Sequence, residues 1–159
     1  METIVVGVDG SQGARLALEF AAREAALRNA RLRIVCAWEI PPAVYAGGFA
    51  PTLDQPTLDG FREGAETVVQ EAVAAAKELQ SAIECEGTAV KGQPAEVLLQ
   101  QAQDADLIVV SNRGHGGFAS LLLGSVSHQV VSMPPVRSRS SAGRTARDAA
   151  KGVMGSILC

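Results

Sequence analysis

A glycine-rich segment, SNRGHGGFASLLLGS at residues 111–125, holds the residues best suited to chemistry. It follows the apolar run DLIVV and precedes VSHQVV, so the sequence predicts a strand that turns through a loop into a helix. Glycines let backbone N–H groups approach a ligand closely, and the first turn of a helix carries a partial positive charge. The segment therefore suits an anion, and a phosphate group in particular.

Asp9 is predicted to lie beside this loop. It follows a first apolar run at 3–8, and parallel strands of an α/β sheet end at one edge, where ligands bind. Ser125 begins the helix after the loop, where its hydroxyl can cap the helix or donate to an anion. Two alternatives need no ligand: Asp9 caps the next helix, and the glycines only satisfy turn geometry.

The elements that must position these residues alternate between strands and helices. Runs rich in β-branched residues predict strands at Thr3–Val8, Arg31–Trp38, Ile83–Val90 and Leu107–Val110. Helical spacing and capping residues predict helices at Ser11–Asn29, at Thr57–Ala82, from Pro94 onward and at Ser125–Val131. This alternation predicts right-handed crossovers and an open parallel α/β sheet with helices on both faces.

Composition sets the broad class. The 159 residues are 47% hydrophobic, which suits one domain with a sizeable core. No apolar run reaches the roughly 20 residues of a membrane span, and METIVV lacks the features of a secretory signal, so we expect a cytoplasmic protein with no membrane partner. Cys36, Cys85 and Cys159 show no metal-ligand spacing and are expected to be free thiols, and two histidines without a carboxylate cluster argue against a metal site.

Three familiar motifs do not match the loop. A Walker loop needs a lysine before its final Ser or Thr, and no lysine lies between Gly92 and Lys151. Gly114, Gly116 and Ala119 have the spacing of a dinucleotide fingerprint, but that motif follows the first strand and needs an acidic residue about 20 positions later. The glycine-flanked elbow of a serine hydrolase is also missing.

The chain resembles the universal stress protein family over residues 1 to 132. The matching stretches are VVGVDGS, VCAWE, GQPAEVLLQQAQDADLIVV and RGHGGFASLLLGSVSHQVV. Nucleotide-binding members carry Gly, two residues, Gly, nine residues, Gly, and then Ser or Thr. Here the register runs Ser111, Gly114, Gly124 and Ser125, so the first glycine is a serine. The resemblance implies a five-stranded, Rossmann-like parallel sheet of the adenine nucleotide alpha hydrolase type.

The resemblance also implies ATP as the ligand, with any Mg²⁺ arriving on its phosphates. Carried over by position, Asp9 and Ala37 lie against the nucleoside. The residues implied to hold the ribose and phosphates are Ser111, Gly114, Gly124, Ser125, Val126 and Ser127. Arg113 is a candidate phosphate partner, with a solvated loop position as its alternative.

Ser111 departs from the family pattern. If the position needs a left-handed backbone, or if a ligand presses on its α-carbon, serine costs about 1–2 kcal/mol. If the residue merely ends the strand, serine costs little. The departure mildly favours a family member that binds no nucleotide and acts through protein–protein contacts.

Residues 133–159 do not fit the family and are predicted to be an atypical basic tail, disordered or only adventitiously folded. Five basic residues against one acidic residue at 137–151 make a local charge of +4, where the resemblance implies an apolar fifth strand. Codons that can encode Pro134–Ala142 give Ala-Cys-Pro-Val-Ala-Val-Val-Arg in another frame, so we hypothesise a frameshift near Ser132 or Met133. The tail then has no nucleic-acid role, and losing the fifth strand weakens the family's usual homodimer.

The predicted function is a regulatory module of the stress response that senses adenine nucleotide with little or no hydrolysis. No residue is poised as a general base beside the phosphates, so we expect no enzyme. An enzyme with adenylyl or hydrolytic chemistry on the same scaffold is a third alternative, because fold alone does not determine activity.

Overall fold

The computed structural model describes residues 1–40, 55–111 and 125–132. Its strands are β1 (Thr3–Gly7), β2 (Arg31–Trp38), β3 (Cys85–Lys91) and β4 (Leu107–Val109). Its helices are α1 (Gln12–Arg28), α2 (Gln55–Leu79), α3 (Pro94–Gln101) and α4 (Ser125–Ser132). The predicted tail and the disrupted fifth strand fall on residues 133–159, outside the described residues.

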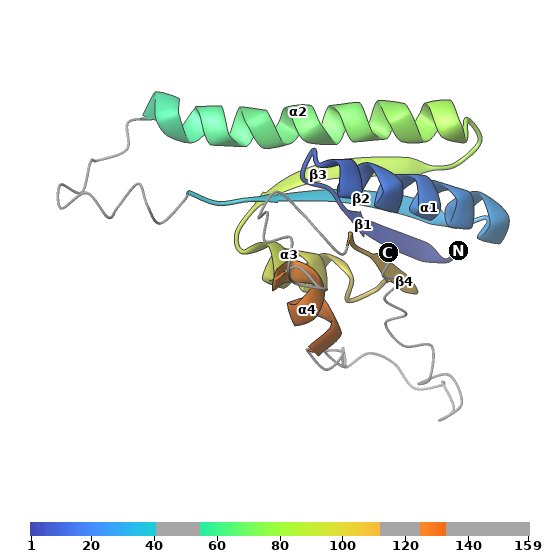
Figure 1. The fold of residues 1–159 in the computed structure, drawn as a ribbon. Helices are drawn as coiled ribbons and strands as arrows, with labels where there is room; N and C mark the ends of the chain where they lie inside the picture. The colour runs from blue at the N-terminus through green and yellow to red at the C-terminus, as the bar shows by residue number, and fades with distance from the viewer. Residues whose placement is uncertain (41–54, 112–124, 133–159) are drawn as a thin grey trace.

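The four strands form one parallel sheet in the order β3-β2-β1-β4, which confirms the predicted fold class. The chain steps outward from β1 to β2 and β3 and then crosses back to the far side of β1. Because parallel crossovers are right-handed, the reversal moves the later helices to the opposite face of the sheet. Figure 1 shows this arrangement, with α1 and α2 on one face and α3 and α4 on the other.

Each sheet face has its own apolar layer. Val6, Ile34 and Val109 point toward α1 and α2, and their exposed fraction is 0%. Val5 and Val35 point to the other face and pack with residues of α3 and α4. Since successive strand residues face opposite sides, a sheet covered on both faces needs an unbroken apolar run in its central strands.

The ends of α1 were predicted correctly because its caps are local. Ser11 is the N-cap, and its side chain accepts a hydrogen bond of 3.2 Å from the Ala14 N–H. Asn29 ends the helix in a left-handed conformation, with φ of 51°. Its backbone N–H donates to carbonyls of the last turn, which is the usual way to close a helix.

The third strand begins later than predicted, at Cys85 instead of Ile83. The residues between α2 and β3 form a turn, in which the Ile83 N–H donates to the Gln80 carbonyl at 3.3 Å. β3 lies at the edge of the sheet and several of its residues are exposed. An edge strand therefore carries a weaker apolar pattern than a central one, which shifts the predicted boundary.

Gly87 lets α2 lie directly on β3. A Cβ atom added there would be 2.7 Å from Val73 Cγ2 and closer still to Val69 Cγ1, whereas no atom lies within 4 Å of a Cβ added at Gly64 of α2. The two glycines therefore differ in what alanine would meet, since one is packed against branched side chains and the other faces open space.

We predict that Gly87→Ala lowers the free energy of unfolding by about 1–3 kcal/mol, because α2 must move away from the sheet. Gly64→Ala should raise it by about 0.5–1 kcal/mol through better helix propensity. Urea denaturation measures both values. Equal effects of the two substitutions would contradict this packing.

Arg33 ties the end of α3 to the sheet. One of its guanidinium nitrogens, Nη1, donates to the Gln101 carbonyl at 2.7 Å and to Asp104 Oδ1 at 2.8 Å. Its Nε donates to Glu86 of β3 at 3.3 Å. The Arg33 side chain is only 17% exposed, so these bonds anchor the connection that leads into β4. The hydrogen bond from Arg33 lowers the pKa of Asp104 below its ordinary value.

Asp104→Asn is predicted to lower the melting temperature at neutral pH. A carboxyl whose pKa is lowered by folding stabilises the protein above its unfolded pKa, about 4, and loses that contribution as the pH falls through the folded value. The difference between the variant and the unsubstituted protein should therefore shrink below about pH 4. Thermal denaturation from pH 7 to pH 2 measures it, and a difference that stays constant over this range would contradict the ion pair's role.

Candidate functional site

The strand order turns around at β1, and this defines the position of the site. β1 pairs with β2 on one side and with β4 on the other, and Val6 is level with Val109. In open α/β sheets, ligands bind beyond the carboxyl ends of the strands at such a reversal. Asp9 lies two residues beyond the end of β1, and Ser111 lies two residues beyond the end of β4. The structure thus brings these two predicted site residues to neighbouring strand ends.

The turn after β1 is built by Asp9, Gly10 and Ser11. The Asp9 Oδ1 atom accepts a hydrogen bond of 2.9 Å from the Ser11 N–H, and Ser11 then caps α1. Gly10 has φ of +81°, a conformation that favours glycine. The helix cap is therefore Ser11, and the exposed Asp9 carboxylate orients the turn in front of it.

Ala37 lies near the carboxyl end of β2, the strand next to β1. Its half-buried side chain packs with the apolar layer of α3 and α4. Trp38 follows on the opposite face, where the Lys91 ammonium lies 5.7 Å from the centre of its ring. Trp38 is the sole tryptophan of the chain, so its fluorescence reports on this edge of the sheet.

The helix α4 carries the last predicted site residues and lies beside α3 (Figure 1). Ser125 is its first residue. Val126 is half-buried against the apolar layer of α3 and α4, and the exposed fraction of Ser127 is 1%. Ser127 thus lies in the interior close to the start of the helix. Arg113, Gly114 and Gly124 lie outside the described residues.

The backbone of Ser111 is not left-handed. Within residues 1–40, 55–111 and 125–132, Asn29 is the only residue other than glycine with a positive φ. The cost of about 1–2 kcal/mol that a left-handed serine would carry therefore does not apply. Serine fits this half-buried position two residues after the end of β4.

Cys36 is unsuited to nucleophilic chemistry. It is buried in the apolar layer of α1 and α2 and is a free thiol, as is Cys85. Burial, and to a lesser extent the negative charge of Asp9, raises the pKa of the Cys36 thiol to about 11. The thiol is therefore protonated at neutral pH, and the predicted absence of a disulfide holds for both of these cysteines.

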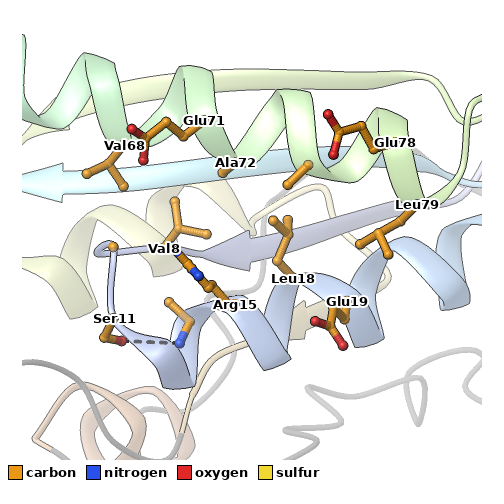
Figure 2. Close-up of a pocket in the computed structure, with 13 residues that line it drawn as sticks. Val8, Ser11, Arg15, Leu18, Glu19, Val68, Glu71, Ala72, Glu78 and Leu79 are labelled. Atoms are coloured by element: carbon orange, nitrogen blue, oxygen red, sulfur yellow. Dashed lines mark hydrogen bonds between the residues drawn. The ribbon is translucent and has the colours of Figure 1, made fainter.

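Among the described side chains, no three His, Cys, Asp or Glu residues gather closely enough to hold a metal ion. None of the helices in the described ranges combines the length and apolar composition that crossing a bilayer requires. Sequence reasoning missed a groove of about 380 Å³ between α1 and α2, because its lining residues have the spacing of ordinary packing helices (Figure 2).

An open parallel sheet with this strand order and this turning point defines a Rossmann-like α/β protein. The chain belongs to the universal stress protein family, whose model matches residues 1–136. It is 34% identical over 131 residues to the universal stress protein Rv2623 of Mycobacterium tuberculosis. The matched region covers 82% of this chain and 41% of that relative. The chain thus spans less than half the length of this curated relative.

Two solved structures are similar to this chain and contain adenine nucleotides. One is a universal stress protein in complex with cAMP, with 32% identity and a TM-score of 0.58, covering 82% of this chain and 87% of that one. The other is the universal stress protein from Archaeoglobus fulgidus in complex with dAMP, with 26% identity and a TM-score of 0.58, covering 82% and 90%. The predicted family and fold are confirmed.

We predict that Ser111→Gly does not stabilise the protein. Because the Ser111 backbone is not left-handed, glycine relieves no strain and should lower the free energy of unfolding by up to about 1 kcal/mol through chain entropy. Asn29→Gly is the matched control, since φ is 51° there, and it should raise the free energy of unfolding by up to about 1 kcal/mol. Chemical denaturation of both variants is the measurement. Stabilisation by Ser111→Gly would show that the position is strained.

Proposed function

We propose that the protein binds ATP at the carboxyl ends of β1 and β4 and acts as a nucleotide-dependent regulator in the stress response. The single observation that carries this proposal is the juxtaposition of Asp9 and Ser111 at neighbouring strand ends where the strand order reverses. In this proposal Asp9 and Ala37 contact the nucleoside. The ribose and phosphates are held by the loop that starts at Ser111 and by the N-terminus of α4.

The related structures support adenine as the base. A cAMP complex and a dAMP complex share an adenine, a five-membered sugar and a phosphate, and these are the parts that ATP would present. Mg²⁺ would enter with the triphosphate, because hard divalent cations prefer phosphate and carboxylate oxygens. Selectivity for ATP over a monophosphate then depends on the glycine-rich loop.

Slow or absent hydrolysis is part of the proposal. Backbone amides that bind a phosphate stabilise the ground state and the transition state equally, and such uniform binding does not lower the activation barrier. Asp9 is engaged with the Ser11 N–H, and Cys36 is protonated at neutral pH. His128 is exposed on α4. In this proposal Asp9 contacts the nucleoside and the Cys36 thiol keeps its proton, so neither is assigned the role of general base for an attacking water.

The serine at position 111 was the reason for the alternative, a family member that binds no nucleotide. That residue has no left-handed backbone, so backbone strain gives this alternative no support. We further propose that the protein acts in the cytoplasm and without nucleic acid. We also propose that loss of the fifth strand weakens the family's usual homodimer in this protein.

A titration of the full chain with ATP, monitored by calorimetry and by Trp38 fluorescence, tests the proposal. We expect saturable binding, and Asp9→Asn should weaken it at least tenfold, because a charged hydrogen bond to the nucleoside is worth about 1.5–3 kcal/mol. Asparagine keeps the acceptor for the Ser11 N–H, so the turn survives.

Asp106→Asn is the matched control. The Asp106 Oδ2 atom accepts a hydrogen bond of 2.9 Å from the Thr3 N–H, at the opposite end of β1. This substitution should leave the affinity for ATP unchanged. Absence of saturation with folded protein would refute nucleotide binding, and steady release of phosphate would refute the regulatory reading in favour of an enzyme.

A further inference from the structure

The groove between α1 and α2 is separate from the proposed nucleotide site. It lies on the face of the sheet that these two helices cover, and its volume is about 380 Å³. Val8, Leu18, Val68 and Leu79 form much of its apolar lining (Figure 2). Asp9 does not line it.

Small side chains leave this space open. Ala14 of α1 and Ala72 of α2 are almost fully buried where the helices approach the sheet, and Ala75 lines the groove higher up on α2. A methyl group does not reach across to the facing helix, which leaves space between the two helices. Leu79 remains 43% exposed at one end of the resulting channel.

Carboxylates dominate the rim. Glu19 of α1 and Glu78 of α2 stand on opposite walls at the end near Leu79, while Arg15 and Glu71 stand toward the other end (Figure 2). Three carboxylates against one guanidinium give the lining a net charge of −2. None of these four side chains forms an ion pair with another described residue.

We propose that this groove binds a small apolar cation, such as a primary amine on an alkyl chain or ring. The apolar part would cover Leu18 and Leu79, and the ammonium group would lie between Glu19 and Glu78. The volume lies in the range of small-molecule sites, about 300–1,000 Å³, whereas a stable protein partner buries about 800 Å² on each side. The negative rim disfavours an anion.

This inference does not rest on the proposed nucleotide site, although the two are close. Gly10 and Ser11 line one end of the groove and directly follow Asp9. The groove ligand is placed at the other end, near Leu79, so it should bind whether or not ATP is present, and failure of one proposal leaves the other open to test.

Hexylammonium is a suitable probe, and 1-hexanol is its uncharged match. We expect backbone NMR signals of α1 and α2 to shift with hexylammonium and to saturate in the millimolar range. Hexanol should bind about two- to fivefold more weakly, which is the effect of losing an exposed ion pair. Raising the salt concentration should weaken hexylammonium alone.

Substitutions locate the probe. Glu19→Gln with Glu78→Gln should reduce hexylammonium binding to the level of hexanol, while Glu63→Gln with Glu96→Gln removes the same charge outside the groove and should have no effect. Ala75→Leu should fill the groove and abolish binding of both probes with the helix intact.

Three outcomes would overturn the proposal. They are no saturable shift by hexylammonium, equal affinity for hexylammonium and hexanol, and binding that survives Ala75→Leu in folded protein.

Discussion

The position of β1 between β2 and β4 is the constraint on which the structure depends. The strand order reverses there, and right-handed crossovers then send α1 and α2 to one face and α3 and α4 to the other. In open α/β sheets, ligands bind beyond the carboxyl ends of the strands at such a reversal. The fold and the location of the candidate site are therefore consequences of one arrangement.

Close packing of small residues supports this arrangement and also explains the groove between α1 and α2. Alanines on α1 and Gly87 on β3 bring helices near the sheet, where larger side chains would hold them apart. The groove lies between α1 and α2, where alanines of both helices leave space between them. The groove and the strand edge share the turn at Gly10 and Ser11, so a ligand in one lies next to the backbone that shapes the other.

Local signals in the sequence predicted much of the fold. Ser11 and Asn29 mark the ends of α1 by side-chain and backbone chemistry that involves only neighbouring residues. The boundary of β3 was less certain, because an edge strand has no continuous apolar run. Asp9 and Ser111 were placed together by the rule for parallel strand ends, and the strand order agrees with that placement. The backbone angle of Ser111 and the groove between α1 and α2 depend on tertiary packing, which spacing alone does not reveal.

The most direct test of the central claim is a crystal structure of the full chain grown with ATP and Mg²⁺. The account predicts nucleotide density beyond the carboxyl ends of β1 and β4, with the Asp9 carboxylate in hydrogen-bond contact with the nucleoside. Nucleotide bound elsewhere on the molecule, with that edge of the sheet untouched, would contradict it.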